Sequence, residues 1–87
     1  MKPSELNATT YLVVCSKLNQ DSIGKDWQKL AGLMGYNIDN VKMYFNGKGD
    51  PADALLTNWE TSSGNDVEKL IGYLKEMGRS DIIELLQ

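Results

Sequence analysis

The chain has 87 residues, of which 41% are hydrophobic and 24% charged, and these values predict one small globular domain with a single core. It contains no histidine and one cysteine, Cys15, which excludes an internal disulfide, a Cys/His zinc site and a Cys–His nucleophile pair. The net charge of −3 makes nucleic acid an unfavourable partner, because phosphate binding needs clustered positive charge. We therefore expect no enzyme activity, no metal and no cofactor.

Membrane insertion is not expected either. The sequence contains no apolar run long enough to cross a bilayer, and no charged leader followed by an apolar stretch. We therefore expect a cytoplasmic domain. The acidic excess lies in residues 60–87, with three basic and six acidic side chains, so a basic protein surface is a better partner than nucleic acid.

Residues 1–7 are expected to form a flexible lead-in, and residues 8–87 the folded domain. Within that domain, apolar residues recur at i, i+3, i+4 and i+7, which predicts four amphipathic helices. The four sets, in chain order, are Tyr11, Val14, Cys15 and Leu18; Trp27, Leu30, Ala31 and Met34; Ala52, Leu55, Leu56 and Trp59; and Val67, Leu70, Ile71 and Leu74.

Weaker patterns predict two more short helices, carried by Ile38, Val41 and Phe45, and by Ile82, Ile83, Leu85 and Leu86. The predicted core anchors are Trp27, Leu30, Leu55, Leu56, Trp59, Leu70, Ile71 and Leu74.

Polar residues and glycines separate these segments. Side chains that can accept hydrogen bonds from a first helical turn precede five of the segments, at Asp26, Asn37, Asp50, Asn65 and Ser80. Glycines suited to helix ends follow at Gly35, Gly47, Gly64 and Gly78. Six short helices with short loops predict an all-α, compact antiparallel bundle.

The segments "GKDWQKLAGLMGY", "ADALLTNWE" and "VEKLIGYLKEMGRSDIIELL" together resemble the death domain, and the resemblance covers residues 8–87. The chain is similar to the death domains of netrin receptors, the low-affinity neurotrophin receptor, NF-κB precursors and Toll-pathway adaptors. The resemblance implies a six-helix antiparallel Greek-key bundle without catalytic function. It also implies a cytoplasmic module, possessed by adaptors and by the intracellular parts of receptors, that binds other death domains and passes on apoptotic or NF-κB-type inflammatory signals.

The resemblance also implies three assembly surfaces, which we define by position. The first surface, on the second and third helices, has Lys29, Asp39, Lys42 and Tyr44. The second, at the end of the fourth helix and the loop after it, has Asn58, Glu60 and Ser62. The third, at the corner between the last two helices, has Arg79, Ser80 and Asp81.

Arg79 and Asp81 have two interpretations. Each is a charge that favours the helix end at which it stands. Alternatively, Arg79 projects as a planar fork of donors for a carboxylate on a partner domain.

Three other assignments remain open. A caspase-recruitment or sterile-alpha-motif domain is a rival helical interaction fold, against which the Leu-Leu-x-x-Trp pattern ending at Trp59 argues. A nucleic-acid-binding helical domain would need a basic stripe, and an enzyme subunit would need a nucleophile next to a base.

Overall fold

A computed structural model of the chain describes residues 1–20, 26–45 and 49–87, and at Ile38, Lys42 and Tyr44 it describes the backbone alone. Within these ranges the chain forms α-helices and one short 3-10 turn, and no strand. In chain order they are η1 (Pro3–Glu5), α1 (Ala8–Asn19), α2 (Trp27–Leu33), α3 (Ile38–Tyr44), α4 (Pro51–Trp59), α5 (Val67–Met77) and α6 (Ser80–Leu86).

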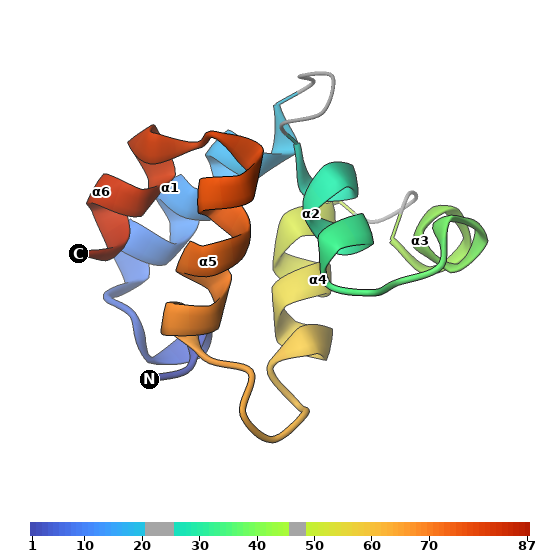
Figure 1. Cartoon of the computed structure of the whole chain (residues 1–87), viewed down its shortest axis with the longest axis horizontal. Helices are drawn as coiled ribbons and strands as arrows, with labels where there is room; N and C mark the ends of the chain where they lie inside the picture. The colour runs from blue at the N-terminus through green and yellow to red at the C-terminus, as the bar shows by residue number, and fades with distance from the viewer. Residues whose placement is uncertain (21–25, 46–48) are drawn as a thin grey trace.

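The helices fold back on one another in an antiparallel Greek-key bundle (Figure 1). Helix α1 packs against α4 and α6, while α5 packs against α6 and α2. Helix α2 also contacts α4 and α3, and α3 lies at one edge of the bundle (Figure 1). The all-α, six-helix fold predicted from the sequence is confirmed.

The buried core draws on all six helices. Leu18, Leu30 and Leu55 are fully buried, together with Leu56, Leu70, Leu74 and Ile82. Both tryptophans are buried and make edge-to-face contacts, Trp27 with Phe45 at 6.4 Å between ring centroids and Trp59 with Tyr73 at 6.2 Å. Such pairs add specificity to the burial of area.

One predicted core anchor is corrected. Ile71 is half-buried and lies outside the buried cluster. The buried stripe of α5 runs through Val67, Leu70, Leu74 and Met77. Because successive helix residues are rotated by about 100°, Ile71 falls on the edge of that stripe.

Three of the predicted helix starts are confirmed. The side chains of Asp26, Asn37 and Asp50 accept hydrogen bonds from backbone N–H groups in the first turns of α2, α3 and α4. Pro51 occupies the first position of α4, where its missing N–H costs nothing.

Two predicted starts are wrong by one residue. Asp66, rather than Asn65, caps α5 by accepting from the Lys69 N–H at 3.0 Å, while the Asn65 amide donates to the Trp59 carbonyl. Helix α6 begins at Ser80, so the cap position belongs to Arg79, which makes no side-chain cap bond.

Glycines end the helices largely as predicted. Gly35 and Gly78 adopt positive φ angles of 95° and 74° directly after α2 and at the end of α5. Gly64 also has a positive φ, but it lies in the loop beyond the end of α4. The predicted stop at Gly47 lies outside the described residues.

The first residues, which the sequence predicts as a flexible lead-in, make contacts with the bundle. Pro3 is fully buried, η1 packs against α4, and the Val67 N–H donates to the Met1 carbonyl at 2.7 Å. Whether residues 1–7 move in solution stays a prediction. In the described ranges, no helix combines the length and apolar character that a membrane span requires.

Candidate protein-interaction surfaces

The α5–α6 corner, which consists of Arg79, Ser80 and Asp81, is built on a tight turn. Gly78 takes the left-handed conformation at the end of α5, and the Arg79 N–H then donates to the Leu74 carbonyl at 3.0 Å. This turn brings the Arg79 side chain over the first turn of α6. There its Nε donates to Asp81 Oδ1 and its Nη2 to Asp81 Oδ2, both at 3.1 Å.

This bidentate pair controls the charge of Asp81. The Arg79 hydrogen bonds are the largest influence and lower the pKa of the carboxyl from 3.8 to about 2, although partial burial raises it. The Ile82 N–H and the Lys17 ammonium, 3.6 Å from Asp81 Oδ2, lower it further. Asp81 is therefore ionised throughout the physiological pH range.

The interpretation in which Arg79 projects toward a partner does not match this geometry. Arg79 is only 9% exposed, and its guanidinium is bound within the chain. The Asp81 side chain is 46% exposed and the Lys17 side chain paired with it is 35% exposed, so the α5–α6 corner presents to solvent a carboxylate with an ammonium beside it. Asp81 also lies in the first turn of α6, where the helix dipole favours an anion, as the alternative interpretation expects. Ser80 is exposed beside it.

The α4–α5 corner, which consists of Asn58, Glu60 and Ser62, is polar and partly closed. Asn58 is exposed, and its Oδ1 accepts from the Tyr36 hydroxyl at 2.6 Å. Ser62 is exposed on the following loop. Glu60 is half-buried, because the N-terminal segment covers it: Ser4 Oγ donates to Glu60 Oε2 at 2.6 Å.

A hollow of about 330 Å³ separates this corner from the end of α2. Trp59 lines the hollow together with residues that carry uncharged polar groups, namely Tyr36, Asn58, Thr61, Ser62 and Asn65. A hollow with this lining can hydrogen-bond a neutral polar group but offers no charge to hold an ionic substrate.

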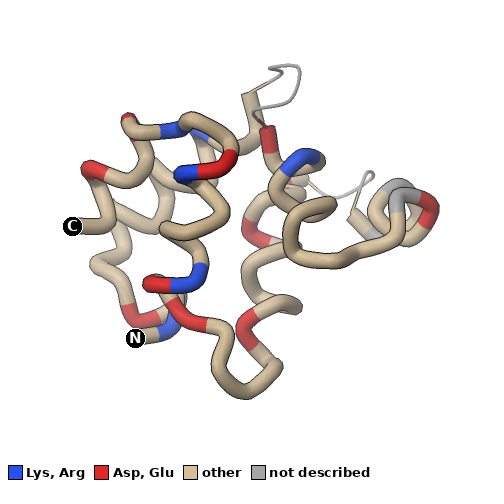
Figure 2. Tube along the Cα trace, viewed as in Figure 1, with Lys and Arg blue, Asp and Glu red and all other residues tan. Residues whose placement is uncertain are grey.

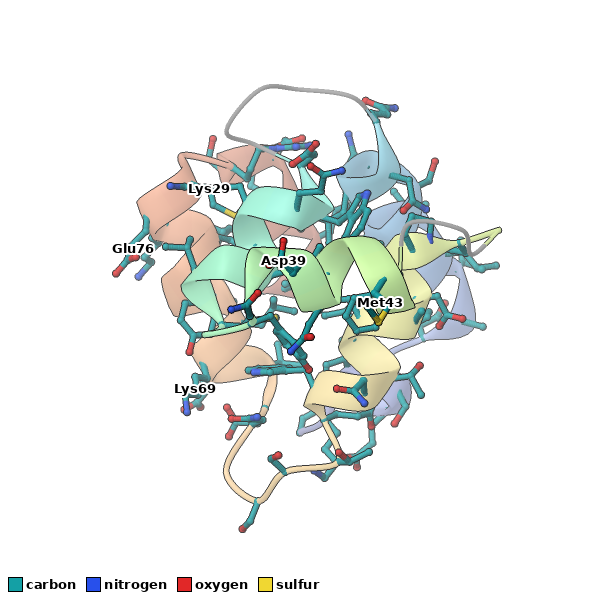
Figure 3. The ribbon with its side chains drawn as sticks, turned by 90° about the vertical axis from the view of Figure 1, so that its right-hand side faces the viewer. Lys29, Asp39, Met43, Lys69 and Glu76 are labelled. Atoms are coloured by element: carbon teal, nitrogen blue, oxygen red, sulfur yellow. The ribbon has the colours of Figure 1, made fainter. Side chains whose placement is uncertain are left out.

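The α2–α3 surface, defined by Lys29, Asp39, Lys42 and Tyr44, carries charges of both signs. Lys29 on α2 and Asp39 on α3 are both exposed. In Figure 3, Asp39 lies on α3 at the front of the view and Lys29 lies on α2 above it, whereas Lys69 and Glu76 lie at the left margin on α5. The side chains of Lys42 and Tyr44 lie outside the described residues, so their predicted place on this surface stays a prediction. Among the described helices, α5 carries charges of both signs and α6 acidic residues alone (Figure 2).

Several large apolar side chains are exposed, and the sequence patterns did not single them out. Met43 is 75% exposed and projects from α3 (Figure 3), and Leu12 is 63% exposed on α1. Met43 falls off the stripe of Val41 and Phe45, which was the available signal. Asp39 lies one turn before Met43 on α3, so this helix presents an apolar and an acidic side chain together (Figure 3).

Burial keeps the Cys15 thiol and the Tyr11 hydroxyl in their neutral forms at neutral pH. Cys15 is buried, and this burial is the main reason that its pKa is raised to about 12, so the thiol stays protonated at neutral pH. Burial, and then the hydrogen bond to Asp53, raises the pKa of Tyr11 as well. No group of three or more Cys, Asp or Glu side chains in the described ranges is placed to hold a metal ion.

The fold and these surfaces define a class: a small all-α module with charged and polar corners and a single buried core. Residues 13–87 match the sequence model of the Death domain. The chain therefore belongs to the death-domain family, which consists of non-catalytic protein-interaction modules.

Known proteins agree with this assignment. The chain is 33% identical over 70 residues to tumor necrosis factor receptor superfamily member 16 of Homo sapiens, covering 80% of this chain and 16% of that protein. It is 38% identical over 64 residues to the death domain-containing membrane protein NRADD of Rattus norvegicus, covering 71% and 28%. It is 31% identical over 83 residues to the nuclear factor NF-kappa-B p105 subunit of Rattus norvegicus, covering 95% of this chain and 8% of that protein. The chain thus spans less than a third of each of these relatives.

Proposed function

We propose that this domain assembles with other death domains, its own copies included, and so transmits apoptotic or NF-κB-type inflammatory signals in the cytoplasm. The observation that carries the proposal is the match of residues 13–87 to the Death domain. Relatives that include a receptor superfamily member and an NF-kappa-B subunit support the signalling context.

Charge is the proposed basis of recognition. The α2–α3 surface offers Lys29 and Asp39, and the α5–α6 corner offers the ionised Asp81 carboxylate. Contacts between such exposed charges are weak one at a time, at roughly 0.2–1 kcal/mol each. They become firm when clustering of the parent chains raises the effective concentration, which makes assembly a switch.

Association should therefore depend on salt, because ionic strength near the physiological value screens exposed charges over about 8 Å. Sedimentation velocity of the 87-residue chain at low and physiological salt measures this directly. We expect a larger weight-average sedimentation coefficient at low salt and at high protein concentration.

Charge reversal at exposed positions locates the surface. Asp39→Lys changes the net charge from −3 to −1. Glu84→Lys, at an exposed position of α6 outside the three surfaces, makes the same change in charge. Asp39→Lys should weaken association, whereas Glu84→Lys should not. Equal effects of the two variants would show that net charge alone, rather than the α2–α3 surface, sets association.

Lys29→Glu provides a second pair, with Lys75→Glu on the exposed face of α5 as its matched control. Arg79 is unsuitable for such a test, because its side chain is buried and hydrogen-bonded, so a substitution there would change folding as well as binding.

A further inference from the structure

Residues 1–4 contact the α4–α5 corner, although about 60 positions of sequence separate them. Ser4 Oγ donates to Glu60 Oε2 at 2.6 Å, and the Lys2 ammonium donates to the Glu60 backbone carbonyl. Val67, the first residue of α5, donates to the Met1 carbonyl at 2.7 Å. Pro3 fills a buried position between these bonds, and Glu5 closes the turn by accepting from the Lys2 N–H at 2.7 Å.

This arrangement leaves one oxygen of the Glu60 carboxylate without a hydrogen-bond donor. Its Oε2 receives only a neutral hydroxyl, and its Oε1 is buried without a hydrogen-bond partner. Within the described ranges, the ion pairs involve Asp81 and not Glu60. A buried carboxylate oxygen without a donor is costly, and an incoming cationic donor would relieve that cost.

We infer that residues 1–6 form an intramolecular clasp that masks the Glu60 carboxylate, and that a basic side chain of a second death domain binds this carboxylate once the clasp opens. The inference rests on the proposed function for the second domain, but the clasp itself needs no partner. Lysine or arginine is the chemistry that fits, because either supplies the charge-assisted donor that Oε1 lacks.

The clasp is suited to opening. Apart from the burial of Pro3, it is held by a few hydrogen bonds, each of modest net strength. Closing it costs the conformational entropy of ordering residues 1–6. Segments held in this way open locally while the rest of the fold stays intact.

The test measures access to Glu60 by labelling carboxylates with a water-soluble carbodiimide and glycine ethyl ester, followed by peptide mass spectrometry. Glu84, which is exposed on α6, supplies an internal reference for the labelling rate. Ser4→Asp places a like charge against Glu60, Ser4→Ala removes one hydrogen bond, and Ser16→Asp on exposed α1 is the charge-matched control.

In the wild type, Glu60 should label far more slowly than Glu84. Ser4→Ala should speed Glu60 labelling by about two- to tenfold, the ratio that corresponds to one hydrogen bond, and Ser4→Asp should speed it further. Amide exchange of Val67 should accelerate in the same order. In Ser16→Asp, Glu60 labelling and Val67 exchange should match those of the wild type. All variants should keep the wild-type helix content by circular dichroism.

Sedimentation then tests the competition. Ser4→Asp should strengthen self-association, and adding Glu60→Gln should remove the gain. Wild-type labelling of Glu60 as fast as Glu84, or labelling unaffected by Ser4→Asp, would overturn the clasp. Faster labelling without stronger association, in a protein whose wild type does associate, would overturn the competition. Labelling as expected in a chain that never self-associates would support the clasp and contradict the proposed self-assembly.

Discussion

The pair formed by Arg79 and Asp81 makes a quantitative prediction about stability. Asp81→Asn keeps the shape of the side chain and one acceptor oxygen but removes the charge that balances the buried guanidinium. The lowering of the Asp81 pKa from 3.8 to about 2 would correspond to roughly 2.5 kcal/mol if none of it were screened. Because the Asp81 side chain is 46% exposed, solvent screening reduces this share to about 1 kcal/mol.

The weakened hydrogen bonding of the buried Arg79 guanidinium adds to that cost. Removing one member of a fully buried pair costs about 3–5 kcal/mol, and an exposed pair contributes at most about 1 kcal/mol. This pair is intermediate, so we expect Asp81→Asn to lower the free energy of unfolding by about 1–3 kcal/mol. For a domain of this size the melting temperature should fall by about 4–8 °C for each kcal/mol.

The effect has a defined pH dependence. The folded-state pKa of Asp81 is depressed, so its contribution is fully present above the unfolded value of 3.8 and is lost as the pH falls toward about 2. Urea unfolding of wild type and Asp81→Asn at pH 7, and then at steps from pH 4 to pH 2, measures the difference. Glu84→Gln on α6 is the matched control and should change stability little. Equal stability of wild type and Asp81→Asn at pH 7, or a difference that is as large at pH 2 as at pH 7, would refute the reasoning.

Three further predictions concern the core and the helices. Trp59→Ala should cost about 3–5 kcal/mol in urea unfolding, because it empties a buried site that also packs on Tyr73; a cost below 1 kcal/mol would contradict its burial. Gly72→Ala should raise the free energy of unfolding by about 0.5–1 kcal/mol, because an added Cβ meets nothing within 4 Å, whereas Gly78→Ala should lower it, because φ there is 74°. Cys15 should react with a thiol-specific disulfide reagent much more slowly in the native state than in guanidinium chloride, because its thiol is buried and protonated; equal rates would place it at the surface.

Local patterns predicted most of the fold. The apolar spacing identified each helix, because a helix must bury one stripe and the stripe repeats every three to four residues. The start expected at Asn65 was displaced by one residue because two acceptor side chains stand next to each other there: the Asp66 carboxylate caps α5, while the Asn65 amide donates to the Trp59 carbonyl. At α6 the cap position falls on Arg79, which makes no side-chain cap bond, so no acceptor side chain marks that start.

The interaction surfaces were less predictable, because they depend on how helix ends meet. Side chains two residues apart do not face each other along a helix, so the Arg79–Asp81 pair requires the left-handed turn at Gly78. The contact of Ser4 with Glu60 joins residues 56 positions apart, and no local pattern encodes it. The exposure of Met43 follows from its register on α3, once that helix is placed.

Sedimentation velocity over a wide concentration range, at low and at physiological salt, shows whether exposed charges drive self-association of the domain. We expect reversible self-association that weakens with salt, that Asp39→Lys reduces and that Glu84→Lys leaves unchanged. A single species of 9.7 kDa at every concentration and in both salts would contradict charge-mediated self-assembly.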